Sequence, residues 1–406
     1  MKSSTCNVCK RHLIRNGSLY GCYSLLRDKR ADLAMIRPLM SPRVLFVSLN
    51  QIRAKIENSM LSRPSFIKTF RRGLHCRIND ILNEFFQAKK RQHRFEGLHC
   101  TLLTHNIVAS QIVRIIYNVD GKQEAMVLKL MSGSNARERS RHRKLIKEEF
   151  QTLKIMHDRD PVSTCSVIRP IMLFEEHLAH ISQYVNAGRL DEILLEKTSR
   201  SFTADCFRRL EHAFYNAGKW LSAFSEEFTT SVCTKKFLDN ELSRMLTTDL
   251  NSLSNRYISR HVRGLMIRIR NGLQDDELKL SKCHGDFIPS NLLMGNDKIY
   301  VTDFSDQHEG LIYEDIARLY QWLEDYRARR PWVDKGQISG LQAAFLEGVF
   351  EERHCEVQAL FFYRALYLLK AIASLRHKPI YHKLTISKSL MTHRERQLEE
   401  LLREVP

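Results

Sequence analysis

The most constraining feature of the sequence is a set of oxygen-bearing side chains at fixed spacing in its later half. Asp286 follows His284 and Gly285, Asn291 comes after four further residues, and Asp303 stands twelve residues beyond Asn291. A carboxylate can accept the proton of a hydroxyl group, and amide and carboxylate oxygens are ligands for Mg²⁺. The spacing is therefore typical of a metal-dependent phosphoryl transfer site.

The residues between Asn291 and Asp303 predict a hairpin. Residues 291–294 are typical of a short strand, residues 295–297 of a turn, and residues 299–302 of the returning strand. Because a hairpin brings the start of its first strand close to the end of its second, we expect Asn291 and Asp303 to lie close together. Their oxygens would then face one ion.

This segment resembles the catalytic region of the aminoglycoside phosphotransferase and choline kinase group, small-molecule kinases with a protein-kinase-like fold. Their catalytic loop reads His-Gly-Asp, four residues, Asn. The resemblance implies that Asp286 is the catalytic base and that Asn291 and Asp303 bind magnesium. Protein kinases instead carry His-Arg-Asp and usually a Lys two residues later, where this chain has Gly285 and Ile288. A small-molecule hydroxyl is therefore favoured over a protein serine as the acceptor.

The resemblance continues beyond the metal ligands. Residues 303–306 (DFSD) and 314–317 (EDIA) are similar to the group's Asp-Phe-Gly-Asp run and to its Asp-Leu-Ala at the start of a helix, with Ser305 in place of the usual Gly. We expect a scaffold role for Asp315, since a carboxylate there can accept backbone N–H groups of the first helical turn. We expect His284 to shape the loop by packing and hydrogen bonding.

An earlier region predicts the side that holds ATP. Residues 110–117 and 124–130 are typical of two strands joined through Asp120-Gly121. Lys129 lies on the second of them, and kinases place such a lysine on their third strand to hold the phosphates. An exposed position on the sheet is the alternative for a single lysine.

The carboxylate partner of Lys129 is expected on the next helix, over residues 141–158. Glu149 begins a Glu-aromatic-x-x-Leu pattern that resembles the group's, which implies that Glu149 is the partner. Glu148 is the second candidate. Alternatively both glutamates are solvated, with Glu148 pairing along the helix with Lys144.

The adenine is expected to rest against backbone groups after the following hairpin. The strand over residues 179–185 ends in Gln183, Tyr184 and Val185, and this end resembles the hinge of the group. The assignment rests on position, because backbone contacts leave no side-chain signature.

The loop that should cover the phosphates departs from the usual pattern. Kinases place a glycine-bearing turn between their first two strands, yet no glycine occurs over residues 98–120. The expected equivalent is the segment 105–110, where Ser110, Asn106 or backbone N–H groups would contact phosphate. This departure puts nucleotide affinity in question.

Together these features predict an α+β, two-lobed protein-kinase-like fold. Residues 96–186 would form an N-lobe with a small antiparallel sheet and one helix, and residues 187–406 a mostly helical C-lobe that carries the catalytic loop. The first C-lobe helix, over residues 202–227, is amphipathic and is expected to lie under that loop. Further helices are expected at 316–326, 342–350 and 355–376, and a polar break at 387–389 before a last charged helix.

Most of the positive charge lies in the segment 1–95, expected to be a basic, mainly helical extension. It holds 20 Lys and Arg against 5 Asp and Glu, so it carries +15 of the chain's net +18 and leaves +3 for the rest. Such a segment suits an anionic membrane surface. The alternative is a set of helices with a solvated charged face that pack against the kinase lobe. We do not expect a nucleic-acid partner, because no recognisable binding module or interleaved aromatic residues are present.

The sequence also indicates a compartment. No apolar stretch is long enough to span a bilayer, and the front lacks the hydrophobic region of a signal peptide. The ten cysteines are scattered, which is typical of a reducing compartment. We expect a cytoplasmic protein, or one held at the inner face of a membrane. Cys6 and Cys9, with His12 and Cys22, are a candidate zinc site, and free thiols are the default.

The expected activity is ATP- and magnesium-dependent phosphorylation of a hydroxyl on a small molecule or glycan. A sugar or a lipopolysaccharide-type glycan is favoured as the acceptor, because the positive net charge suits an anionic acceptor; an aminoglycoside or a choline-like alcohol remains open. Two alternatives remain: a kinase-fold binding protein with weak catalysis, or a protein tethered by its basic segment to a membrane or nucleic acid. The sequence does not indicate an oligomeric state.

Overall fold

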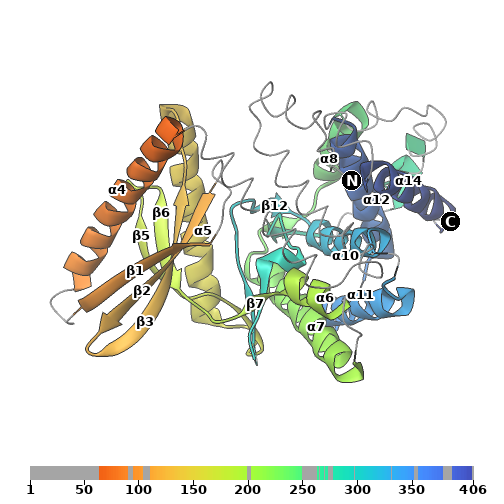
Figure 1. The fold of residues 1–406 in the computed structure, drawn as a ribbon. Coiled ribbons are helices and arrows are strands. Elements are labelled where there is room, and N and C mark those ends of the chain that lie inside the picture. Colours follow the sequence, from red (N-terminus) through yellow and green to blue (C-terminus); the bar gives the residue numbers. More distant parts are fainter. Residues whose placement is uncertain are drawn as a thin grey trace, which may run out of the picture. The chain divides into compact units, whose positions relative to one another are not determined.

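A computed structural model gives the fold of this chain (Figure 1). It describes residues 64–89, 95–103, 110–198, 203–248, 263–272 with gaps, 278–296, 298–330, 332–351, 355–377 and 386–404. The chain divides into two compact units, residues 1–79 with 379–386, and residues 80–378 with 387–406. All the features described below belong to the second unit, except the first part of helix α4 and Ile386, the first residue of the last helix.

The N-terminal lobe contains an antiparallel sheet of five strands in the order β1-β2-β3-β6-β5. The strands are β1 (Phe95–Leu102), β2 (Ser110–Val119), β3 (Lys122–Met131), β5 (Pro170–Phe174) and β6 (Ala179–Gln183). The turn between β2 and β3 has positive φ at Asp120 (50°) and Gly121 (78°). Asp-Gly adopts this left-handed pair readily, which explains why the tight hairpin forms where the sequence predicts it.

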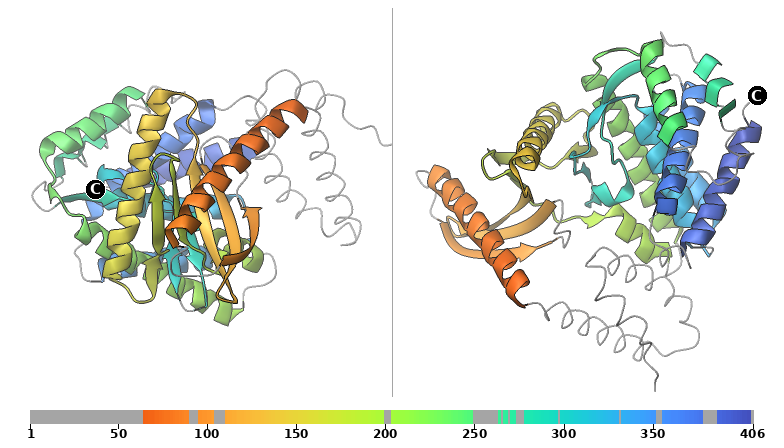
Figure 2. Two further views of the ribbon diagram at one scale, coloured as in Figure 1. Left: turned by 90° about the vertical axis from the view of Figure 1, so that its left-hand side faces the viewer. Right: turned by 90° about the horizontal axis from the view of Figure 1, so that it is seen from above.

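Helices lie on both faces of this sheet (Figure 2): α5 (Ala136–Arg159) on one face and the end of α4 (Pro64–Lys89) on the other. In the last turns of α4, Ile81, Leu82 and Phe85 are buried. The ring of Phe86 meets that of Tyr117 on β2 edge-on, with 5.7 Å between centroids. Residues 80–89 of the basic segment therefore pack on the kinase-like lobe, as one of the two alternatives for this segment expected. The predicted limits of the three domains stay a prediction.

The C-terminal lobe is mostly helical, and together with the sheet lobe it gives the predicted α+β, two-lobed fold. Its helices are α6 (Leu190–Thr198), α7 (Ala204–Glu227), α8 (Lys235–Thr248), α10 (Tyr313–Ala328), α11 (Lys335–Phe350), α12 (Val357–His377) and α14 (Ile386–Glu404). The predicted break at residues 387–389 is wrong, since they form the first turn of α14. Serine suits the first turn of a helix, where backbone N–H groups still need acceptors.

Short strands frame the catalytic region. One sheet has the order β4-β11-β10-β7 and another the order β12-β9-β8. They comprise β4 (Cys165–Val167), β7 (Gly188–Arg189), β8 (Ser231–Val232), β9 (Lys279–Cys283), β10 (Leu292–Met294), β11 (Ile299–Val301) and β12 (His308–Gly310), and a short 3-10 helix, η4 (Pro289–Asn291), precedes β10. The pairing of Leu292 with Val301 confirms the predicted hairpin.

An aromatic core beneath the motif fixes its two halves. The ring of Trp220 on α7 stacks on that of Phe287 at 6.1 Å, and Phe224, one turn further along α7, meets Phe304 at 5.8 Å. Phe287 directly follows Asp286, and Phe304 directly follows Asp303. Helix α7 therefore lies under the catalytic loop as predicted, and burial of these rings fixes the backbone on which both carboxylates stand.

Helices α7 and α11 approach each other so closely that glycine is required at the crossing. A Cβ atom at Gly218 would collide with the carbonyl oxygen of Phe345, and one at Gly348 with that of Tyr215.

In the described part of the chain, no helix has the length and apolarity needed to cross a membrane.

Candidate active site

A buried lysine joins the two lobes. Lys129 Nζ donates hydrogen bonds to both carboxylate oxygens of Glu149 (2.8 and 2.9 Å) and to Oδ1 of Asp303 (2.7 Å). Lys129 is 5 % exposed and Glu149 is 1 % exposed, so the alternative of an exposed lysine is wrong. Glu148 instead lies 3.7 Å from Lys144 along the helix. The structure thus brings Lys129, Glu149 and Asp303 together.

The three groups keep one another ionised. Burial alone would lower the pKa of Lys129, but Glu149 and Asp303 raise that pKa above its ordinary value. Burial alone would raise the pKa of Glu149 and of Asp303, but the ammonium of Lys129 holds both below their ordinary values. The site therefore contains a fixed ammonium between two carboxylates at neutral pH.

The backbone around Asp303 is held in an unusual conformation. Its φ of 67° is in the left-handed region, which non-glycine residues seldom adopt. Ser305 Oγ donates to Asp303 Oδ1 (2.6 Å), and the backbone N–H of Phe304 donates to Glu149 Oε1 (3.3 Å). Ser305 thus replaces the usual glycine with a hydroxyl that orients the carboxylate. Such local strain is common at functional sites.

Asn291 connects Asp286 to the hairpin. Its Nδ2 donates to the backbone oxygen (2.8 Å) and to Oδ2 (3.0 Å) of Asp286. The backbone N–H and the hydroxyl of Thr302 both donate to the carbonyl oxygen of Asn291, each at 3.0 Å. Asn291 is therefore held beside the residue that precedes Asp303, as the hairpin prediction required.

The catalytic loop is anchored by Asp315 on α10. Its Oδ2 accepts the backbone N–H of His284 (2.6 Å), and its Oδ1 that of Gly285 (2.9 Å). The scaffold role of Asp315 agrees with the prediction from the sequence. The predicted partners were wrong, because Asp315 accepts N–H groups of the catalytic loop and not those of the first turn of its own helix. Gly285 has a φ of 82°, and a Cβ there would collide with the carbonyl oxygen of Asp306, so the loop requires glycine.

His284 stabilises the loop as a neutral residue. It is fully buried, its Nε2 lies 3.1 Å from the carbonyl oxygen of Thr302, and its ring packs on Phe304 at 4.6 Å between centroids. Burial lowers the pKa of His284 to about 4, so its imidazole is uncharged at neutral pH. This agrees with the expected packing and hydrogen-bonding role.

Arg318 is a residue of the site that the motif analysis missed. From α10, its Nη1 donates to Asp286 Oδ1 (3.2 Å), so that Arg318 holds one oxygen of Asp286 while Asn291 holds the other. Burial raises the pKa of Asp286, and the nearby guanidinium and amide only partly offset that increase. The sequence did contain a sign that Arg318 is close to the site: it stands one helical turn after Asp315 and shares its face of α10.

The donor set fits a divalent cation. Among the described residues, Asn291 Oδ1 and Asp303 Oδ2 take part in no hydrogen bond, while the other polar atoms of these two side chains do. Hard cations such as Mg²⁺ prefer amide and carboxylate oxygens of this kind. The depressed pKa of Asp303 keeps the carboxylate charged for such an ion.

Two of the three predicted hinge residues use their backbone N–H groups in hydrogen bonds within the protein. The backbone N–H of Gln183 donates to the carbonyl oxygen of Arg169 (2.9 Å), and that of Tyr184 to the carbonyl oxygen of Ala125 (3.3 Å). No hydrogen bond from the N–H of Val185 is found within the described residues. Of the three predicted hinge residues, Val185 therefore offers a backbone donor to a ligand.

Among the described residues, Ser110 makes no hydrogen bond to the other predicted site residues. Ser110 begins β2 two residues before Ile112, which pairs directly with Lys129, so Ser110 and Lys129 lie on the same face of the sheet. The rest of the expected phosphate loop, residues 105–109, lies outside the described residues. So do the candidate zinc ligands near Cys6 and most of the basic segment.

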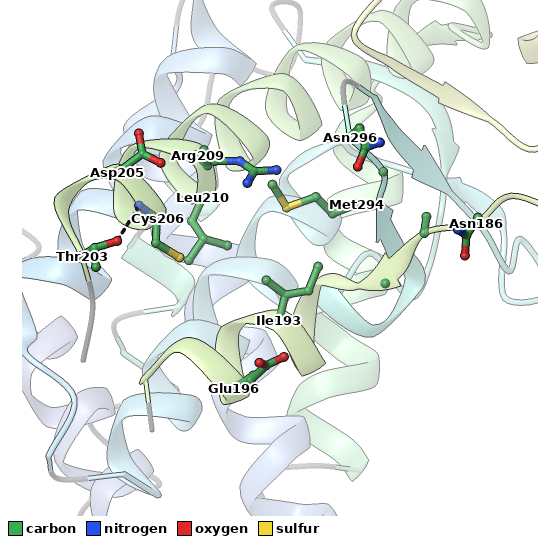
Figure 3. Close-up of a pocket in the computed structure, with 13 residues that line it drawn as sticks. Asn186, Ile193, Glu196, Thr203, Asp205, Cys206, Arg209, Leu210, Met294 and Asn296 are labelled. Carbon is green, nitrogen blue, oxygen red and sulfur yellow. Dashed lines mark hydrogen bonds between the residues drawn. The ribbon is translucent and has the colours of Figure 1, made fainter. Parts of the chain in front are cut away.

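A separate cavity of about 660 Å³ lies at the other end of β10 (Figure 3). Asn186, Ile193, Arg209 and Met294 are among its lining residues. None of the site residues predicted from the sequence lines this cavity.

Comparison with known proteins assigns the chain to a family. The model of the phosphotransferase enzyme family matches residues 108–355, which is more than half of the chain and includes Lys129, Asp286 and Asp303. The chain therefore belongs to the phosphotransferase enzyme family and is a phosphotransferase. No match was found among curated proteins.

Several solved structures are similar to the chain. A glucosamine kinase in complex with glucosamine, ADP and inorganic phosphate is 13% identical, covering 77% of this chain and 94% of its own, with a TM-score of 0.48. The aminoglycoside phosphotransferase APH(4)-Ia is 14% identical, with coverage of 82% and 99% and a TM-score of 0.48. A choline/ethanolamine kinase family protein from Mesorhizobium loti is 12% identical, with coverage of 72% and 86% and a TM-score of 0.42.

Proposed function

We propose that this phosphotransferase moves the terminal phosphoryl group of ATP, with Mg²⁺, to a hydroxyl of a small molecule or glycan. The observation that carries the proposal is the lysine bridge. Lys129 joins Glu149 to Asp303, and Asp303 lies beside the hairpin that also holds Asn291 and, through it, Asp286. A phosphate-binding lysine, metal ligands and a base are the parts that phosphoryl transfer requires.

Each residue has a task in this proposal. Lys129 binds the phosphates of ATP and remains oriented by Glu149, while the N–H of Val185 hydrogen bonds to the adenine. Asn291 and Asp303 hold the metal ion, which when bound would neutralise charge on the phosphates. Asp286 accepts a hydrogen bond from the acceptor hydroxyl and orients it for in-line attack. Arg318 and Asn291 fix the Asp286 carboxylate so that it presents one geometry to that hydroxyl.

We favour a sugar or a lipopolysaccharide-type glycan as the acceptor over an aminoglycoside or choline. The support is the charge of the chain, +18 overall, because strongly cationic acceptors require acidic pockets. A cytoplasmic location, at or near an anionic membrane surface, is part of the same proposal and is supported by the +15 of residues 1–95.

A screen of acceptors tests the proposal. Purified protein with ATP and Mg²⁺ is mixed with sugars, sugar derivatives, glycan extracts, aminoglycosides and amino alcohols, and ADP formation is measured. We expect acceptor-dependent ADP formation that Asp286→Asn abolishes while the variant still binds nucleotide. The proposal is contradicted if the protein neither binds ATP with Mg²⁺ nor forms ADP with any acceptor.

A further inference from the structure

The guanidinium of Arg318 has more hydrogen-bond donors than the protein uses. An arginine side chain carries several N–H groups. Within the described residues, Arg318 makes a single hydrogen bond, from Nη1 to Asp286 Oδ1. Its Nε is buried and has no hydrogen-bond partner there. Because the Arg318 side chain is 24 % exposed, the terminal N–H groups that make no hydrogen bond to the described residues can be reached by a group from outside the protein.

The position of this guanidinium is fixed. It lies over the ring of Tyr367 on α12, with 5.5 Å from Cζ to the ring centroid, and its other contacts are with Asp286 and Glu314. The Arg318 side chain is 24 % exposed and that of Asp286 is 32 % exposed. A ligand that reaches Asp286 can therefore also reach Arg318, which is held in one orientation by the aromatic ring.

Several cationic groups near Arg318 share a single carboxylate. Glu314 lies 3.1 Å from His308, 3.9 Å from Lys370 and 4.0 Å from Arg318, so one carboxylate serves three cationic groups. Hydrogen bonding to Glu314 raises the pKa of His308 to about 9, so His308 is also positive at neutral pH. The next carboxylate, Asp315, directs both oxygens to backbone N–H groups of the catalytic loop.

From this geometry we propose that the acceptor carries a negatively charged group, a phosphate or a carboxylate, which Arg318 binds beside the attacking hydroxyl. Lys370 provides a second cation for the same group. The inference rests on the proposed function and adds the chemical class of the acceptor. A guanidinium next to the base suits such a group, because its parallel N–H donors match two oxygens of a phosphate or carboxylate.

Binding of inorganic phosphate tests the inference without requiring turnover. Mg²⁺ and a non-hydrolysable ATP analogue are added to saturation, so that the nucleotide's own phosphate positions are occupied, and phosphate is titrated calorimetrically; acetate is titrated in a parallel arm. We expect saturable binding of at least one of the two anions. Arg318→Met should weaken binding of the anion by at least about tenfold. Lys370→Met should weaken it by a smaller factor, and this variant provides the test if Arg318→Met does not fold.

Arg364→Met is the matched control. Arg364 lies on the same helix as Lys370 and stacks on a tyrosine, Tyr320, at 4.3 Å, so the variant loses the same charge and a similar contact without touching Asp286. We expect it to bind the anion as the wild type does. In the acceptor screen, sugar phosphates and sugar acids should have lower KM values than the matching neutral sugars, and Arg318→Met should remove the difference.

The outcomes separate this inference from the function on which it rests. A wild-type protein that binds the ATP analogue but neither anion, or an Arg318→Met variant that binds the anion as tightly as the wild type, overturns the inference alone. A wild-type protein that does not bind the ATP analogue overturns the proposed function and this inference with it.

Discussion

The two carboxylates of the motif lie in opposite surroundings. On the nucleotide side, Asp303 is paired with buried Lys129, which holds its pKa below the ordinary value. On the acceptor side, burial raises the pKa of Asp286, and the single guanidinium of Arg318 offsets that increase only in part. The difference teaches how environment would assign the roles in the proposed function: a permanently charged carboxylate suits a metal ion, and a more basic carboxylate suits a hydroxyl proton.

The largest effect is expected from removing either carboxylate. Asp286→Ala should lower kcat by about 100-fold to 10,000-fold, the usual contribution of a general base, and should leave nucleotide binding intact. Asp303→Ala should lower kcat at least as much and should also weaken binding of the metal–nucleotide complex. Steady-state ADP formation and calorimetric titration of the ATP analogue distinguish the two. Equal nucleotide affinity in both variants would contradict the proposal that Asp303 serves the nucleotide and Asp286 the acceptor.

The free energy of unfolding should also differ between variants of Lys129, beside Asp303, and variants of Arg318, beside Asp286. Lys129→Met leaves Glu149 and Asp303 without their buried cation, so we expect a loss of about 3–5 kcal/mol in the free energy of unfolding. Arg318→Met should cost less, because Asp286 is 32 % exposed and water can solvate it. Urea unfolding of both variants checks the order. The interpretation fails if the Lys129 variant is as stable as the wild type.

A third change tests whether the end of the basic segment belongs to the nucleotide-side lobe. Phe85 on α4 is 3 % exposed, and Phe85→Ala should reduce the free energy of unfolding by about 3–5 kcal/mol if the helix packs on the sheet. Gln87→Ala, at an exposed position two residues later, is the control and should change little. Thermal unfolding measures both. An unchanged melting temperature for Phe85→Ala would mean that α4 does not stabilise this lobe.

The smallest effect concerns pH on the acceptor side. The pKa of His308 is raised to about 9 by Glu314, above its unfolded value of 6.5. The stabilisation from this pair is therefore fully present below pH 6.5 and is lost as the pH rises through about 9. Because the His308 side chain is 43 % exposed, we expect less than about 1 kcal/mol. Melting temperatures between pH 6 and pH 10 should fall more for the wild type than for His308→Gln, and parallel curves would contradict this.

The sequence predicted most of the site because its parts are local. The hairpin from Asn291 to Asp303, the strand with Lys129 and the helix with Glu149 each follow from short-range patterns. The family resemblance then implied the two lobes and the ion pair of Lys129 with Glu149. The structure places these residues together, while their roles in catalysis stay predictions. The break at residues 387–389 was wrong because polar residues suit a helix start as well as a loop.

The acceptor side could not be predicted in the same way. Arg318 and Tyr367 meet only through the packing of α10 on α12, and no sequence pattern links two helices that are separated by α11 along the chain. The partners of Asp315 were also missed, because a carboxylate at a helix start has N–H groups of its own helix within reach. Here the tertiary structure brings the N–H groups of His284 and Gly285 to it instead.

The most direct test of the account is metal binding at Asp303. Mn²⁺, a spectroscopic substitute for Mg²⁺, is titrated in the presence of the ATP analogue and followed by electron paramagnetic resonance. Asp306→Ala, which removes an exposed carboxylate three residues later, serves as the control. The account predicts that Asp303→Ala weakens formation of the bound Mn²⁺–nucleotide complex by at least about tenfold, while Asp306→Ala leaves it unchanged. Equal Mn²⁺ binding by the wild type and Asp303→Ala would contradict the account.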